Sequence, residues 1–276
     1  MFNYLTSSLR RKIARRITKE YPAKIDAFHI EDIGEIAFAN WDNPLITPTQ
    51  LNAGVVAFFK QFIKPGNLAI DIGANIGDTT VPMALAATST GLTLGFDPNP
   101  YVFKILQQNA LLNKDKTNII PVPYAITTKE EEFYFISSEA SFGNGGISST
   151  KESRHGKFLY HEKIKGINLK KFLEENHSSW LPKLSFIKID TEGYDKEILK
   201  SIKDLVTAYK PTVIVESFGP SSDAEKIELY EVIKDMGYQL FYFEDFTINA
   251  TVKKLTLETD ILSYKQTVNI LALAER

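Results

Sequence analysis

The chain has 276 residues, of which 43% are hydrophobic and 24% charged, and its formal net charge is -2. This length fits one large α/β domain with additions and is short for two full domains. The near-neutral balance gives no overall basic field, so charge-driven binding to nucleic acid is not expected. No cysteine is present. This excludes disulfides, zinc–thiolate sites and thiol catalysis, and it agrees with a cytoplasmic location.

The first twenty residues predict a basic amphipathic helix. Leu5, Leu9, Ile13 and Ile17 recur at every fourth position, and arginine and lysine occupy much of the remainder. One interpretation is docking on an anionic membrane surface or partner. The other is that the apolar stripe packs on the domain or on a second subunit. Peripheral membrane contact through residues 1–20 and a homo-oligomer therefore both stay open.

From residue 68 onward, short β-rich runs alternate with helix-length segments. This order predicts a Rossmann-like α/β fold, with a seven-stranded, mostly parallel sheet, helices on both faces and a terminal antiparallel hairpin. We place this domain at residues 59–276, after an N-terminal helical extension at 1–58. The predicted strands are 68–72, 92–96, 119–122, 184–189, 212–216, 238–243 and 268–273, and the predicted helices are 76–87, 100–113, 196–206 and 223–236.

Residues 127–168 interrupt the alternation. Glu131–Ile136 predicts a strand, Ser138–Thr150 is rich in glycine and serine, and Phe158–Ile167 predicts an antiparallel partner. An insertion beside a cofactor-binding turn is where a lid or substrate loop would lie. The alternative is a surface loop without a role in binding.

A glycine-rich turn follows the first predicted strand of this domain. The segment Asp71-Ile-Gly73-Ala-Asn75-Ile-Gly77 ends an apolar run, and a second apolar run ends at Asp97, 24 residues after Gly73. This is the layout of a nucleoside-binding βαβ unit. The glycine spacing that dinucleotide phosphates need is absent, and the carboxylate of Asp71 would repel a pyrophosphate.

A cationic cofactor fits this turn better than a dinucleotide. S-adenosylmethionine carries an ammonium and a sulfonium and has no phosphate, and its ribose diol could donate two charge-assisted hydrogen bonds to Asp97. We therefore expect a methyltransferase. A nicotinamide-dependent oxidoreductase is the alternative from another enzyme class.

Carboxylates end several of the predicted strands. Four acidic residues come at or just after the end of a predicted strand: Asp71, Asp97, Asp190 and Glu216. The carboxyl ends of parallel strands meet at the same edge of a sheet, so we expect these side chains to lie along one edge. Methyl transfer to a hydroxyl requires an acceptor oxygen held in line and a proton acceptor, for which Asp190 is the candidate. The alternative is that Asp190, with Glu192 or Glu216, binds a divalent cation that acidifies the hydroxyl.

Two histidines of the insertion, His155 and His161, are further candidates for the catalytic base. The alternative for both is a solvated loop position. The four histidines of the chain are too scattered for an HExxH metal site.

Over residues 59–276 the sequence resembles the FkbM family of S-adenosylmethionine-dependent methyltransferases. The resemblance implies that Asp71, Gly73 and Asn75 hold the methionine part, that Asp97 holds the ribose, and that Asp190 and Glu192 face the transferred methyl. The matching segments are 64–78, 96–100, 109–113, Ala125, 145–149, 186–193 and 269–273, and Ala74, Gly77, Pro98 and Ala125 complete the implied cofactor site.

The resemblance also implies O-methylation of a sugar, glycan or small-metabolite hydroxyl. The chain has Asp97 where the family usually has Glu. A non-catalytic scaffold in surface-glycan assembly is a further alternative. A nucleic-acid substrate is not expected, because the Asn/Asp-Pro-Pro-aromatic segment that holds a flipped base is replaced here by Asp190-Thr-Glu-Gly.

Overall fold

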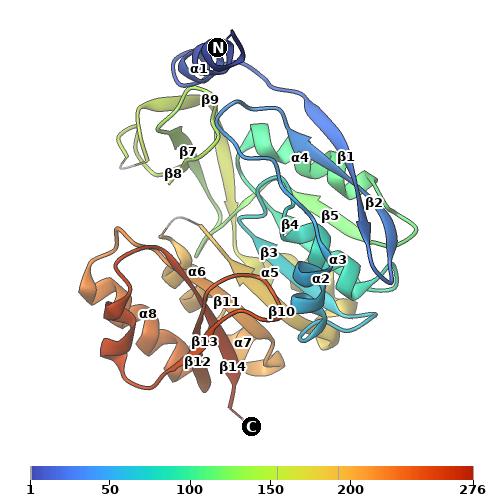
Figure 1. The fold of residues 1–276 in the computed structure, drawn as a ribbon. Helices are drawn as coiled ribbons and strands as arrows, with labels where there is room; N and C mark the ends of the chain where they lie inside the picture. The colour runs from blue at the N-terminus through green and yellow to red at the C-terminus, as the bar shows by residue number, and fades with distance from the viewer. Residues whose placement is uncertain (1, 154, 192, 276) are drawn as a thin grey trace.

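A computed structural model of the chain describes residues 2–153, 155–191 and 193–275, with side chains from residue 6 onward. A central sheet carries helices on both faces, and a small second sheet and the N-terminal helix lie together at one end of the molecule (Figure 1). The helices are α1 (Phe2–Ala14), α2 (Ala53–Lys60), α3 (Thr80–Ala87), α4 (Pro100–Leu111), α5 (Leu169–Asn176), α6 (Asp195–Ser201), α7 (Lys203–Tyr209) and α8 (Asp223–Asp235), with 3-10 helices at Ser178–Lys183 and Glu258–Ser263. The strands are β1 (Ala23–Ile30), β2 (Gly34–Trp41), β3 (Leu68–Ile72), β4 (Leu92–Phe96), β5 (Ile119–Val122), β6 (Ala125–Ile126), β7 (Glu131–Ser137), β8 (Gly146–Ser148), β9 (Phe158–Ile167), β10 (Leu184–Ile189), β11 (Thr212–Ser217), β12 (Tyr238–Phe243), β13 (Val252–Leu255) and β14 (Val268–Ala274).

The main sheet has the strand order β13-β12-β14-β11-β10-β3-β4-β5. The neighbours from β5 to β11 are parallel, and β14 lies antiparallel between β11 and β12. The predicted doubly wound fold with its antiparallel end is confirmed. The predicted count of seven strands is one short, because the polar and mostly exposed strand β13 pairs with the outer edge of β12.

Alternate residues of the buried strands pack against the two helical layers. One layer comprises α5 to α8, whose Leu173, Ile198 and Leu229 belong to one core cluster with Ile70 of β3. On the other face, Phe59 of α2 and residues of α3 pack against the sheet. The predicted helix at 196–206 is divided in the structure at Ile202, which is fully buried between α6 and α7.

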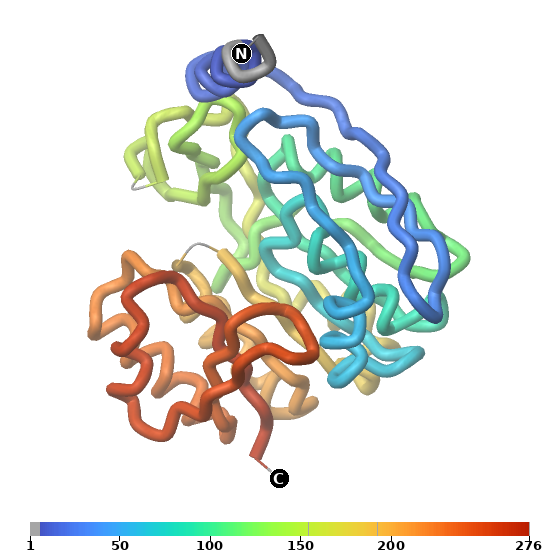
Figure 2. Tube along the Cα trace, in the orientation of Figure 1, coloured from blue at the N-terminus to red at the C-terminus, as the bar shows by residue number. Residues whose placement is uncertain are grey.

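The N-terminal hairpin β1–β2 is bound to α4. Asn109 accepts a hydrogen bond from the Ala39 amide at 2.7 Å and donates to the carbonyl oxygens of Ala39 and Ile76. Asn113 makes a similar pair of bonds with the backbone of Ala37. The tube in Figure 2 shows the blue hairpin running along the outer side of the main domain. The two asparagines thus satisfy backbone groups of β2 that have no strand partner on that side.

The insertion contributes β7, β8 and β9 to a four-stranded sheet with the order β6-β9-β7-β8, and β6 lies just before it in the chain. The antiparallel pairing of β7 with β9 is the one that the sequence predicted. The short strand β8 follows the glycine-rich segment and pairs with β7.

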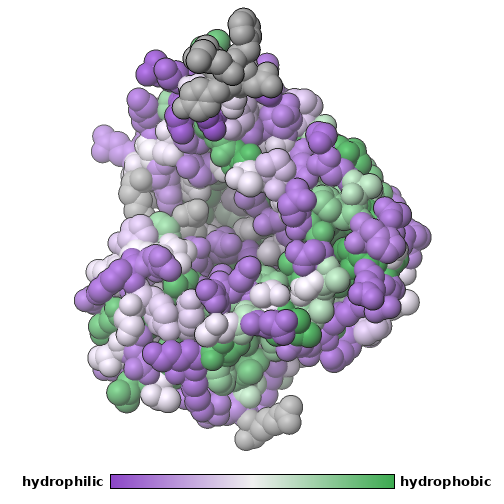
Figure 3. Space-filling model, viewed as in Figure 1, coloured by the Kyte–Doolittle hydropathy of each residue, from purple (hydrophilic) through white to green (hydrophobic). Residues whose placement is uncertain are grey.

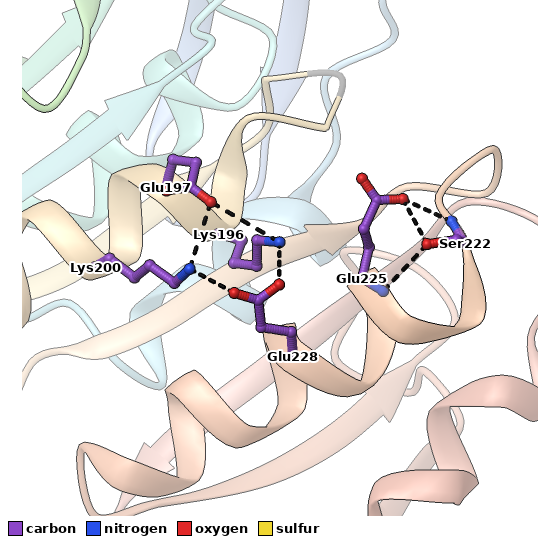
Figure 4. Close-up of polar contacts among 6 residues, drawn as sticks. All are labelled: Lys196, Glu197, Lys200, Ser222, Glu225 and Glu228. Atoms are coloured by element: carbon purple, nitrogen blue, oxygen red, sulfur yellow. Dashed lines mark hydrogen bonds and ion pairs between the residues drawn. The ribbon is translucent and has the colours of Figure 1, made fainter.

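A group of surface contacts joins α6 to α8 (Figure 4). Lys196 and Lys200 both pair with Glu228, and hydrogen bonds from these two ammonium groups lower the pKa of Glu228 to about 2. Ser222 and Glu225 form a capping box that begins α8. The ion pairs of Glu228 hold α6 and α8 together on the face that is covered by α5 to α8.

Within the described residues, no helix is both long and apolar enough to cross a membrane.

Candidate active site

A cavity of about 420 Å³ lies at the carboxyl ends of β3, β4 and β10. The glycine-rich segment 143–147 of the insertion forms the opposite wall. Figure 3 shows the molecule hollowed on this face, between the insertion and the C-terminal helices. The cavity is therefore at the edge of the sheet where open α/β folds bind their ligands.

The turn after β3 is fixed by its neighbours on both sides. The amides of Gly73 and Ala74 donate to the carbonyl oxygen of Phe96 at 2.9 and 3.0 Å. Gly73 has a φ of +81°, and a Cβ there would lie 1.8 Å from the carbonyl oxygen of Asp190. Only glycine fits between these two strands, so the cavity floor is bare backbone at this point.

Asp97 follows directly on β4 and lines the cavity. One carboxylate oxygen accepts a hydrogen bond from the amide of Asn75 at 2.7 Å, and the other accepts from the amide of Asn99 at 2.8 Å. Burial raises the pKa of Asp97 to about 7, although these two backbone donors oppose the rise. Each oxygen keeps a lone pair for a ligand hydroxyl, because a carboxylate has about four acceptor sites.

Asp71 is fully buried behind the turn and does not line the cavity. The hydroxyls of Thr79 and Thr80 donate to one of its oxygens at 2.8 and 2.7 Å, and the other oxygen lies 3.4 Å from Nζ of Lys188. The structure therefore does not bring the Asp71 carboxylate to the cavity, and its contact with a cofactor stays a prediction. Its carboxylate is turned inward by these donors, so it acts on the site through Lys188.

Lys188 connects Asp71 to the cavity. Its ammonium lies 3.0 Å from a carboxylate oxygen of Asp190, and its side chain is 4% exposed. Burial opposes the positive charge, but the charges of Asp190, Asp71 and Asp78 outweigh burial and raise the pKa of Lys188. The side chain of Asp190 is 40% exposed. A buried cation thus orients a carboxylate that is open to a ligand.

Four described carboxylates and one described ammonium line the cavity. The acids are Asp78, Asp97, Asp190 and Glu216, and the base is Lys188. Burial raises the pKa of Asp78 to about 6, against the attraction of Lys188. The excess of negative charge suits a ligand with cationic groups and disfavours a pyrophosphate.

The other predicted site residues divide into three groups. Asn75, Pro98 and Ala125 line the cavity with Gly73. Ala74 and Gly77 are buried beneath it, and Gly77 has a φ of +99° and lies against Leu106 of α4. Glu192 lies outside the described residues.

The two candidate histidines are not equivalent. His155 lines a side pocket with Thr191 and Tyr194, two residues that also line the main cavity. The structure does not bring His161 to the cavity: its exposed ring on β9 lies 3.5 Å from Glu162.

Several cavity residues were not assigned a role from the sequence. Asp78 follows directly on the glycine motif, and Lys188 lies on β10, two positions before Asp190. Their places beside these motifs could have indicated a role in the site. Tyr124, Tyr194 and Phe246 also line the cavity. For these aromatic residues the sequence gives no pattern that separates them from core positions.

Asp190 and Glu216 both line the cavity, as the suggested metal site would need. Among the residues that the structure describes, no group of three or more histidine and acidic side chains is arranged to hold a metal ion. A divalent cation stays a prediction from the sequence.

The strand order and a ligand cavity at the carboxyl edge define the Rossmann-like fold of class I methyltransferases. The chain belongs to the FkbM methyltransferase family, because residues 71–240 match the methyltransferase FkbM domain. This match gives residues 71–240 the domain of a methyltransferase. It favours the methyltransferase over the nicotinamide-dependent oxidoreductase.

Three individual proteins are similar to the chain over part of their length. The chain is 28% identical over 162 residues to the hexuronic acid methyltransferase AglP of Haloferax volcanii, an alignment that covers 59% of this chain and 60% of AglP. Among solved structures, it is similar to a methyltransferase FkbM from Methylobacillus flagellatus, with 11% identity, a TM-score of 0.45 and coverage of 79% of this chain and 50% of that one. An S-adenosylmethionine-dependent O-methyltransferase from Thermotoga maritima has 9% identity, a TM-score of 0.43 and coverage of 92% and 78%.

Proposed function

We propose that the protein transfers a methyl group to a hydroxyl oxygen of a sugar, a glycan or a similar small metabolite. The observation that carries the proposal is the half-exposed carboxylate of Asp190, held by a buried ammonium at the wall of the cavity. A positioned carboxylate can take the proton that a hydroxyl loses as its oxygen is methylated. The similarity to a hexuronic acid methyltransferase supports a sugar as the acceptor.

The cavity has the groups that S-adenosylmethionine requires. Its ribose hydroxyls would donate to the remaining lone pairs of Asp97, and its cationic end would find the negative charge of Asp78 and Glu216. The bare backbone at Gly73 leaves room for close approach, because a side chain there would fill the floor. When bound, the cofactor supplies an electrophilic methyl group on a sulfonium whose thioether is already a good leaving group.

The protein's own contribution is then positioning and proton transfer. The insertion and Asp190 hold the acceptor hydroxyl in line with the methyl group. As the oxygen–methyl bond forms, the hydroxyl proton passes to a carboxylate oxygen of Asp190. Lys188 keeps that carboxylate oriented, and Asp71 keeps Lys188 charged and in place. His155, in the adjoining pocket, is the second candidate base.

The test is a titration followed by a transfer assay. Calorimetry with S-adenosylmethionine and with NADH should show binding of the first alone. A panel of hexuronic acids, neutral sugars and simple phenols is then incubated with radiolabelled cofactor, and the position of the new methyl is read by nuclear magnetic resonance. Methylation of a hydroxyl supports the proposal. Methylation of nitrogen or carbon, or binding without transfer to any of the panel, as a scaffold would show, counts against it.

A further inference from the structure

The N-terminal segment carries an apolar stripe that faces solvent. The side chains of Leu9, Ile13 and Ile17 are 59%, 38% and 58% exposed. Their spacing of four residues places them along one side of α1 and the turn after it. The interpretation that this stripe packs on the domain is therefore wrong for these three residues. Ala14 is instead the fully buried contact of the segment.

The same segment is strongly basic, whereas the remainder of the chain is acidic. Residues 1–20 contain six basic residues and one acidic residue, hence a net charge of +5, against -7 for the remainder of a chain whose net charge is -2. All six basic side chains are exposed. Apolar and basic side chains thus share one solvent-facing segment.

This segment is held in a fixed place. The amide of Ala140 donates to the carbonyl oxygen of Arg15 at 3.3 Å, and the guanidinium of Arg15 lies 3.8 Å from Glu139. Arg10 pairs with Asp42 at 3.1 Å. Figure 1 shows α1 seated on the insertion sheet at the end of the molecule. The stripe is therefore presented by a docked helix and not by a free tail.

We propose that α1 and the turn after it form a docking surface for an anionic lipid bilayer. The exposed leucine and isoleucines would enter the boundary between headgroups and acyl chains, and the arginines and lysines would bind the lipid phosphates. A second copy of the chain that paired stripe on stripe is a poorer occupant, because it would bring two segments of +5 together. An acidic protein or nucleic acid would satisfy the charges but leave the apolar stripe in water.

Flotation with vesicles tests the proposal on the full chain. Vesicles of equal parts phosphatidylglycerol and phosphatidylcholine should carry the protein upward, and vesicles of phosphatidylcholine alone should carry at least tenfold less. Substituting Arg11, Lys12 and Arg16 by Gln should weaken binding by about fivefold for each charge removed. Substituting Leu9, Ile13 and Ile17 by Ala should also reduce binding tenfold or more, although the charge is unchanged.

Matched variants control for general effects of charge and hydrophobicity. Lys114, Lys203 and Lys253 are exposed lysines outside the segment, and their change to Gln should leave flotation unchanged. Leu111, Ile248 and Leu257 are exposed apolar residues elsewhere, and their change to Ala should also have no effect. Calorimetry with S-adenosylmethionine verifies that each variant keeps its fold.

Three outcomes would overturn the proposal. The first is equal binding to neutral and anionic vesicles. The second is equal loss in the matched variants. The third is sedimentation as a dimer that dissociates when the stripe is changed to alanine, without any binding to vesicles, since this would assign the stripe to a second copy. None of these outcomes depends on which molecule accepts the methyl group.

Discussion

Asp97→Asn is the substitution with the most specific expected outcome. The carboxylate accepts from Asn75 with one oxygen and from Asn99 with the other. An amide side chain keeps one acceptor and puts a donor in place of the second. One of the two backbone amides therefore loses its partner, and a ribose hydroxyl no longer meets a charged acceptor.

The size of the effect follows from these contacts. A hydrogen bond to a charged group contributes about 1.5–3 kcal/mol, so the Kd for S-adenosylmethionine should rise roughly ten- to hundredfold. The pKa of Asp97 is raised to about 7 in the cofactor-free protein, and hydroxyl donors favour the ionised form. Wild-type affinity should therefore weaken by up to about tenfold per pH unit below about pH 7 and level off above it.

Isothermal titration calorimetry from about pH 6 to about pH 8 measures both effects. The variant should bind weakly and lack the slope near pH 7, while a smaller slope from Asp78 at lower pH should remain. Asp204→Asn, at a side chain that is 81% exposed, is the control. Wild-type affinity in Asp97→Asn, or an unchanged slope, would refute the assignment of Asp97 to the ribose.

Three further substitutions test other parts of the site. Asp190→Asn should lower kcat by about a hundredfold or more with little change in cofactor Kd; equal losses in both constants would make it a cofactor contact instead. Gly73→Ala should lower the free energy of unfolding by about 3 kcal/mol or more, because its Cβ would meet the Asp190 carbonyl oxygen; a wild-type Tm would contradict this. Burial, helped by the charge of Asp190, raises the pKa of Asp195 to about 7, so wild-type stability falls as the pH rises from about 4 to about 7. Asp195→Asn should therefore raise the Tm at about pH 8 and leave it unchanged at about pH 4; an equal shift at both would exclude this titration as the cause.

The parallel strands could be predicted closely from the sequence. Leu68–Ile72 and Leu92–Phe96 are buried on both faces, so each is a mostly apolar run, interrupted only by Asp71 or Thr93, with a turn at its end. The hairpin β1–β2 could not be predicted in this way. Half of β1 is exposed, and β2 is held by Asn109 and Asn113, at least seventy residues away in the chain.

The sequence predicted which residues lie near the site better than it predicted which side chains face the cavity and which are buried behind it. The end of a strand told us which rim Asp71 occupies, but not that Thr79 and Thr80 would turn its carboxylate inward. Lys188 needed contacts with Asp71 and Asp190 from two strands before its role could be seen. Such roles depend on side chains that meet only in three dimensions.

The close approach of Gly73 to the Asp190 carbonyl has a consequence for biosynthesis. The turn that begins the cofactor site is completed by the end of β10, which leaves the ribosome more than a hundred residues later. A nascent chain that ends before residue 190 would lack one side of this turn and the carboxylate of Asp190. Cofactor binding should therefore appear abruptly in a series of C-terminal truncations, and S-adenosylmethionine should protect only chains that extend past β10 from proteolysis.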